Sequence, residues 1–250
     1  MKEKEDFYSK AGKIFEENGL SEYLCDEILE KFYLLTEIML ETNKKMNITA
    51  ITDIPAVIAR HYADSLLMLK VGIERGARIC DIGCGGGFPS FPIAIARPDL
   101  FVTGIDSTAK KVAYVNDTAK RLGLKNLSAI SGRAEELASA SGEMRESFDV
   151  VTARAVASLP VLSELCLPFV KVGGLFVALK AKTGEEELDA AKEGIKKLGG
   201  RIEGSEKLIL RDETLEKEGG AERLLVTVRK IAPTTEKYPR AFGQIKKKPL

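Results

Sequence analysis

From Arg78 onward, short β-type runs alternate with helical stretches of about ten to fifteen residues. Parallel strands cannot be joined by a tight turn, so this alternation predicts a mostly parallel sheet with helices on both faces. The expected strands cover residues 78–82, 101–106, 127–131, 148–154, 174–180, 206–210 and 223–230. We therefore predict a Rossmann-like α/β fold with a seven-stranded sheet, in which a ligand would bind at the carboxyl ends of the strands.

The chain before residue 76 has a helical pattern instead. After a loop at about 43–52, Asp53 is placed as an N-cap with Pro55 in the first turn, which predicts a helix as far as about Leu69. We expect a helical extension at 1–75, a ligand-binding domain at 76–232 and a basic tail at 233–250. A further helix in the extension is predicted by apolar residues at helical spacing, namely Cys25, Ile28, Leu29, Phe32, Leu35 and Met39.

The segment CDIGCGGGFPSFP, residues 80–92, concentrates glycine directly after the first expected strand. It lacks the Gly-Lys-Ser/Thr ending of a phosphate-binding loop. A dinucleotide-binding fingerprint would need glycine where Phe88 stands, because that glycine lets helix and strand pack closely. A tight turn without a ligand is a further alternative. An acid followed by alternate glycines is typical of S-adenosylmethionine-dependent methyltransferases, and here the pattern comprises Asp81, Gly83, Gly85 and Gly87.

The next two strand ends carry residues that suit the same cofactor. Asp106, followed by Ser107, ends the second strand about 20–25 residues after the loop, where a carboxylate accepts ribose hydroxyls in nucleotide-binding folds. After the third strand, the backbone of Ala134 and the side chain of Glu135 could contact the adenine. Asp106 could instead only cap a helix, and Glu135 could only favour a helix N-terminus. We predict S-adenosyl-L-methionine as the cofactor of the 76–232 domain.

Composition excludes few partners. The chain has 250 residues and a formal net charge of +1, so any surface for nucleic acid must be a local one. No apolar run approaches the roughly 20 residues of a membrane span, and the charged N-terminal residues do not resemble an export signal. The four cysteines are scattered, and no histidine stands near Cys80 and Cys84. We therefore expect a cytoplasmic protein without a metal site, with reduced cysteines and no membrane partner.

Several segments across nearly the whole chain form a specific combination: MNITAITD…RHYADSL, CDIGCGGGFPSFPIAIARP, IDSTAKKVAYV, GRAEEL, FDVVTARAVASL, ALKA and KYPRAFGQIKKKPL. Together they resemble the RsmG (GidB) methyltransferases of bacteria. The resemblance implies transfer of a methyl group to N7 of one guanine in 16S ribosomal RNA, the small-subunit RNA. Cys84 stands where a family member often has threonine, and the loop 139–147 is of a variable type. The cofactor contacts that the resemblance implies are Gly83, Phe88, Ala134, Glu135 and Arg154.

The implied chemistry needs no general base, because guanine N7 has a lone pair and carries no proton. A single histidine and the lack of a Ser–His–Asp set are compatible with it, and we assign no catalytic residue. Alignment of nucleophile, methyl carbon and sulfur would supply most of the catalysis. The alternatives are a methyltransferase for another RNA or a small molecule, and a non-catalytic ribosome-assembly factor.

Polar and cationic residues near the expected cleft and in the tail are candidates for binding RNA. The substrate would be either naked ribosomal RNA or the RNA of an assembled small subunit. His61 could instead be a packing residue within its helix, and Arg154 and Lys180 could form structural salt bridges. The tail has no acid from residue 237 onward, which favours a role in RNA binding over a merely solvated end. We expect the protein to be a monomer. The RNA-binding candidates are Asn47, Arg60, His61, Lys180, Lys246, Lys247 and Lys248, with Arg154 for cofactor or RNA.

Overall fold

The computed structural model describes residues 2–154, 157–181, 183–212 and 220–250. A seven-stranded sheet with the order β3-β2-β1-β4-β5-β7-β6 forms the centre of the protein. β7 runs antiparallel to both β5 and β6, whereas the pairs from β3 to β5 are parallel. The predicted Rossmann-like α/β fold is confirmed. The strands are β1 (Arg78–Ile82), β2 (Phe101–Asp106), β3 (Leu127–Ser131), β4 (Phe148–Ala153), β5 (Val170–Lys180), β6 (Gly200–Leu210) and β7 (Ala221–Lys230).

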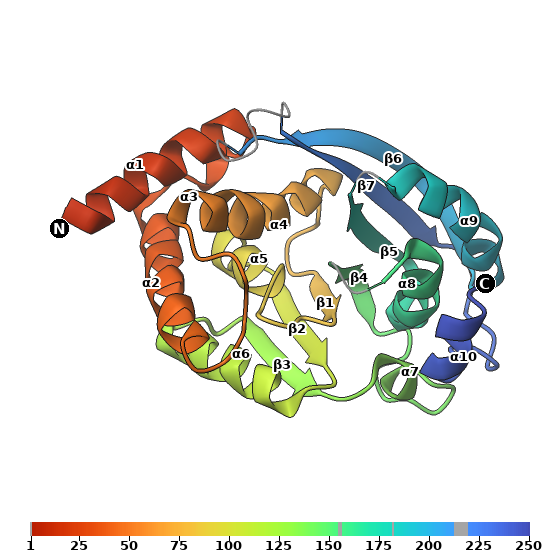
Figure 1. Ribbon diagram of the computed structural model, residues 1–250. Coiled ribbons are helices and arrows are strands. Elements are labelled where there is room, and N and C mark those ends of the chain that lie inside the picture. The colour runs from red at the N-terminus through yellow and green to blue at the C-terminus, as the bar shows by residue number, and fades with distance from the viewer. Residues whose placement is uncertain (1, 155–156, 182, 213–219) are drawn as a thin grey trace.

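Alternate residues of the central strands build two hydrophobic clusters, one on each face of the sheet. In β5, Leu175 and Val177 belong to one cluster, and Phe176 and Ala178 belong to the other. This follows from the two-residue period of a strand, which turns successive side chains to opposite faces. Figure 1 shows the N-terminal helices with α5 and α6 on one side of the sheet, and α8 and α9 on the other.

A helix lies between each pair of successive strands from β1 to β6, as the alternation in the sequence predicts. The longer helices are α1 (Lys2–Glu17), α2 (Asp26–Asn43), α5 (Ser90–Ala96), α6 (Ala109–Arg121), α8 (Leu159–Cys166) and α9 (Gly184–Lys197). Shorter helices are α3 (Ile54–Val57), α4 (Asp64–Leu66), α7 (Ala134–Leu137) and α10 (Phe242–Lys247). Single-turn and irregular segments are η1 (Ser21–Tyr23), η2 (Ile58–Ala63), η3 (Leu67–Val71) and η4 (Leu167–Phe169).

The expected helix from Asp53 to about Leu69 forms, but it changes type along its length. Asp53 caps it as predicted, since its carboxylate accepts a hydrogen bond from the Ala56 amide at 3.2 Å. The segment η2 is a π-helix, in which the Asp64 amide donates to the Ala59 carbonyl five residues earlier. π-Helical turns are rare and are found most often at functional sites. Both Arg60 and His61 lie on this turn.

The N-terminal extension packs into the same hydrophobic cluster as the sheet. Phe32 of α2 stacks on Tyr62 with ring centroids 4.6 Å apart, and Phe15 of α1 contacts Phe32 edge-on. All three rings are completely buried. The Tyr62 hydroxyl lies 2.6 Å from the Thr36 hydroxyl, so its polar end has a partner within this apolar cluster.

The basic segment 233–250 also packs on the domain. Arg240 donates to both carboxylate oxygens of Glu164, a fully buried side chain on α8, at 2.8 and 2.6 Å. Tyr238 and Ile245 are buried, whereas Lys246, Lys247 and Lys248 are exposed. The apolar and paired residues therefore attach this segment, and its lysines face solvent. Among the residues that the structure describes, no helix is long and apolar enough to cross a membrane.

Candidate active site

A cleft of about 770 Å³ opens at the carboxyl ends of β1, β2, β3 and β4. Asp81 and Gly87, two residues of the predicted glycine motif, are not among the described residues that line it. In and around the cleft, the structure describes no group of three or more potential metal ligands. The predicted residues that do line the cleft are Gly83, Gly85, Phe88, Asp106, Ser107, Ala134, Glu135, Arg154 and His61.

Backbone hydrogen bonds fold the glycine loop onto the end of β2. The amides of Gly83 and Cys84 both donate to the Ile105 carbonyl, at 2.7 and 3.0 Å. Asp106 accepts from the Gly85 amide at 3.0 Å and from the Thr108 amide at 2.8 Å. The Asp106 carboxylate thus supports the loop and begins the next helix, and its remaining lone pairs are available to a ligand in the cleft.

Two glycines of the loop are required by space, and one of them, Gly87, is also required by its backbone conformation. Gly87 has a φ of +86°, and a Cβ there would lie 2.1 Å from the ring of Phe91. At Gly86 a Cβ would lie 2.7 Å from the Cγ2 of Ile48. Gly87 therefore serves the packing of the loop against α5, which explains why it does not face the cleft.

Asp81 is fully buried at the end of β1. Its Oδ2 accepts a hydrogen bond from the Ser90 hydroxyl at 2.5 Å, and its Oδ1 has no partner among the described residues. Burial raises the pKa of Asp81 to about 6, against the opposing effect of the Ser90 hydrogen bond. A contact between Asp81 and the cofactor, which the acid-and-glycine pattern suggests, stays a prediction.

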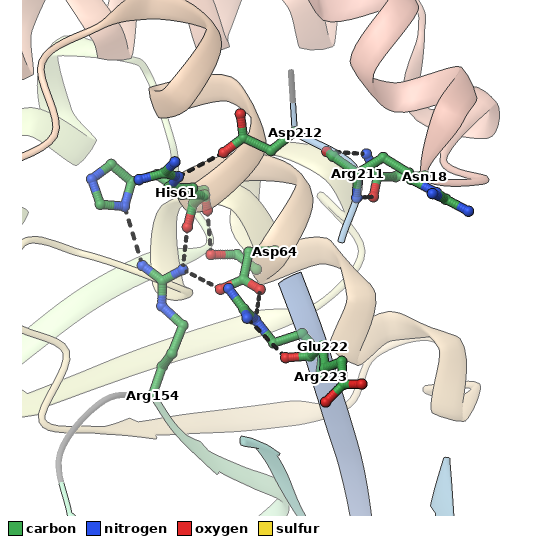
Figure 2. A network of polar contacts seen from close by, with 10 residues as sticks. Asn18, His61, Asp64, Arg154, Arg211, Asp212, Glu222 and Arg223 are labelled. Carbon is green, nitrogen blue, oxygen red and sulfur yellow. Dashed lines mark hydrogen bonds and ion pairs between the residues drawn. The ribbon is translucent and has the colours of Figure 1, made fainter. Parts of the chain in front are cut away.

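Arg154 is held at the cleft wall by the helical segment that precedes β1. Its Nη1 donates to the Arg60 carbonyl at 2.8 Å and to Asp64 Oδ2 at 3.1 Å (Figure 2). The other carboxylate oxygen of Asp64 accepts from Arg223 Nε at 2.6 Å. Asp64 therefore lies between two guanidinium groups, one from the end of β4 and one from β7, and its side chain is only 8% exposed.

His61 forms the adjoining part of the wall as a neutral imidazole. Its ring stacks on Phe88 with centroids 4.4 Å apart and an interplanar angle of 11°. Burial, together with the positive charges of Arg154 and Arg60, lowers the pKa of His61 to about 3. Nε2 lies 2.8 Å from the Thr49 hydroxyl, and Nδ1 lies 3.4 Å from Arg154 Nη2. Because Arg154 can only donate, Nδ1 is the acceptor and Nε2 carries the proton.

Two of the predicted RNA-binding cations are engaged within the protein. Arg60 Nε donates to Asp212 at 2.6 Å, and Lys180 lies 2.9 Å from Glu187 while it donates to the Ala157 carbonyl at 2.8 Å. Lys180 therefore forms a salt bridge within the protein, which was the alternative to its binding RNA. Asn47 and the three lysines of residues 246–248 are exposed. Their contacts with RNA stay predictions.

The residues in or behind the cleft wall that were not found from the sequence include Asp64, Lys111 and Phe242. Asp64 follows His61 by three positions on a helical stretch, a spacing that places both on one face, and this was the available signal. Lys111 lies in the first turns of α6, after the Asp106 strand end. Phe242 comes from the far end of the chain, and no local pattern connects it with the cleft.

The chain matches the family model described as rRNA small subunit methyltransferase G over residues 28–211. A relative in Staphylococcus carnosus, described as ribosomal RNA small subunit methyltransferase G, is 44% identical over 229 residues, which is 91% of this chain and 92% of that protein. A relative of the same description in Bacillus subtilis is 43% identical over 235 residues, covering 94% of this chain and 95% of the other.

Solved structures share the fold at much lower identity. The YcgJ protein of Bacillus subtilis is similar with a TM-score of 0.52 and 16% identity, over 69% of this chain and all (100%) of that chain. The M. jannaschii protein TYW2, solved in complex with AdoMet, is similar with a TM-score of 0.51 and 16% identity, over 67% of this chain and 77% of that one.

Proposed function

This chain belongs to the rRNA small subunit methyltransferase G family, and on that premise we propose that it methylates N7 of one guanine in 16S ribosomal RNA. It is a methyltransferase that uses S-adenosylmethionine. The observation that carries the proposal is the cleft of about 770 Å³ at the carboxyl ends of the strands, which the glycine loop, Asp106 and Glu135 line together.

The residues of the cleft fit S-adenosylmethionine, which supplies a methyl group on a positively charged sulfur. Gly85 has a φ of +53° and no side chain, so its backbone is open to a ligand. We assign the ribose to the free lone pairs of Asp106. The adenine is assigned to Ala134 and Glu135, which begin α7 at the third strand end. The cleft volume lies within the range of about 300–1,000 Å³ that is typical of small-molecule sites.

The side chains of the cleft suit a nucleophile that needs no deprotonation. His61 is neutral, and its two ring nitrogens are already engaged by Thr49 and Arg154. Guanine N7 attacks with its own lone pair, so the protein has only to align the base with the methyl carbon. The guanine gains positive charge as the bond forms. A carboxylate or a carbonyl group beside the base would stabilise that charge.

An RNA substrate is expected to reach the cleft as a distorted or unstacked segment, because the reacting base must leave its stack. The exposed lysines at residues 246–248 would contact phosphates beside it. Action on ribosomal RNA is compatible with the cytoplasm, which we propose as the location. We also propose that one chain suffices for the reaction, which sedimentation of the active protein would check.

The decisive experiment uses isotope-labelled S-adenosylmethionine with small-subunit ribosomal RNA and with assembled small subunits. Digestion to nucleosides and mass spectrometry should give 7-methylguanosine and no other labelled nucleoside. Label on adenine or on a ribose oxygen would refute the N7 assignment, and label only on small metabolites would refute an RNA substrate. Gly85→Val is the matched negative control, because valine is strained at a φ of +53° and would fill the cofactor side of the loop.

A further inference from the structure

A second, smaller hollow adjoins the cleft. It has a volume of about 170 Å³ and lies between residues 46–48 and the beginning of α6. Met46, Asn47, Lys110 and Tyr114 border this hollow and are absent from the described lining of the cleft. The two hollows therefore share a wall, and a chain of nucleotides with one base in the cleft would pass beside the second. The residues common to both are Ile48, Gly85, Gly86, Thr108 and Lys111.

The hollow is formed before any ligand binds, because its outer wall is fixed by hydrogen bonds. The Asn43 side chain accepts from the amides of Ile48 and Thr49 at 2.8 and 3.0 Å, and it donates to the Thr49 carbonyl at 3.0 Å. Ile48 packs so closely on Gly86 that a Cβ at Gly86 would lie 2.7 Å away. The distance between this wall and the glycine loop is thus determined by the fold.

The chemistry of the lining suits a nucleotide. Met46, Ile48 and Tyr114 offer apolar surface to the faces of a base, and the exposed Asn47 amide can both donate to and accept from a base edge. Lys110 and Lys111 are exposed beside them. None of the described residues that line the hollow is acidic, and the structure describes no carboxylate in salt-bridge contact with either lysine.

We propose that this hollow binds the base of a nucleotide next to the methylated guanine, with its phosphate on Lys110 and Lys111. The inference rests on the proposed RNA substrate. The competing occupant is the methionine end of the cofactor. RNA is favoured because that end carries an ammonium group beside its carboxylate, and the hollow offers no acid among its described residues to pair with the ammonium. A phosphate meets the opposite, favourable charge.

Binding measurements on single variants test which ligand the hollow serves. Asn47→Ala and Lys110→Ala change residues that border the hollow and do not line the cleft. Each should weaken binding of the shortest RNA that the parent enzyme methylates by about fivefold to tenfold. Affinity for S-adenosylhomocysteine, measured by calorimetry, should not change. Lys120→Ala is the matched control, an exposed lysine on the same helix that is outside the hollow, and it should bind RNA like the parent.

RNA with single abasic sites tests whether a base enters the hollow. We expect one position next to the target guanine at which the loss of the base weakens binding to the parent by about tenfold. The Asn47→Ala/Lys110→Ala double variant should bind intact and abasic RNA alike. Equal sensitivity in parent and variant would overturn the proposal, and so would a variant that loses cofactor affinity. Methylation of intact RNA by the parent tests the proposed function separately.

Discussion

Replacing Asp64 with asparagine should remove the charge between Arg154 and Arg223 while keeping the shape of the side chain. The exposed fractions of the three side chains are 8%, 16% and 18%, so both guanidinium groups would be left largely buried without a counter-charge. Loss of one partner of a buried pair costs about 3–5 kcal/mol. The arginines keep hydrogen bonds to the carbonyls of Arg60 and Glu222, so we expect the lower end of this range.

A loss of about 3 kcal/mol corresponds to a fall in Tm of roughly 6–12 °C for a chain of this size. Urea unfolding at neutral pH gives the free energy directly. Asp189→Asn is the control, because Asp189 pairs with Lys192 on the exposed face of α9, and such a pair contributes at most about 1 kcal/mol. Affinity for S-adenosylhomocysteine should also fall in Asp64→Asn, since Arg154 loses its orientation at the cleft wall.

A double-mutant cycle with Arg223→Gln separates the charge interaction from other losses. Once Asp64 is neutral, removing the Arg223 charge should cost much less than it does in the parent, because no favourable pair remains to be broken. Additive effects, or a loss below about 0.5 kcal/mol in Asp64→Asn, would show that this network does not stabilise the wall as its geometry indicates.

Three further outcomes are expected. Gly87→Ala should lower Tm and cofactor affinity together, because the new Cβ would lie 2.1 Å from the Phe91 ring at a φ of +86°; a parent-like Tm would contradict the packing. The pKa of His61 is about 3 in the folded protein and about 6.5 in the unfolded chain, so the unfolded chain takes up the proton at a higher pH. The stability of the folded protein should therefore fall as pH decreases from about 6.5 towards 3. His61→Gln should flatten that part of the stability profile, and an unchanged slope would refute the assignment. Alanine at all three lysines of residues 246–248 should weaken RNA binding and reduce its salt dependence without changing cofactor affinity, and unchanged salt slopes would exclude the tail as a phosphate contact.

The first strands could be predicted almost to the residue because their signal is local. β1, β2 and β3 have the predicted bounds, and β4 ends one residue earlier, at Ala153. β5 and β6 begin earlier than predicted, at Val170 and Gly200. The first residues of β6 are mostly exposed, and residues 171–174 of β5 include two glycines. Glycines and charged residues interrupt the β-formers in these stretches, which weakens the pattern by which a strand is recognised.

The positions of the glycine loop and of Asp106 at the cleft were predictable for the same reason. The glycine loop follows β1 directly and Asp106 ends β2, and parallel strands bring their carboxyl ends together at one edge of the sheet. The Asp106 carboxylate caps the turn at Thr108, as the alternative interpretation expects, and it also supports Gly85. Its contact with a ribose stays a prediction. The choice between Lys180 as a free cation and as a salt-bridge partner depended on Glu187, which is on a different element.

The sequence alone determined the fold class, the position of the glycine loop and the order of polar strand ends, because each of these is written in neighbouring residues. Only the tertiary structure decided which distant charges meet. Asp64 contacts Arg154 and Arg223, which are 90 and 159 positions away in the chain, and Arg240 reaches Glu164 across 76 positions. Such pairs leave no periodic trace, since they depend on the packing of helices against both faces of one sheet. Whether a lysine or arginine is available to RNA is therefore a property of the folded protein.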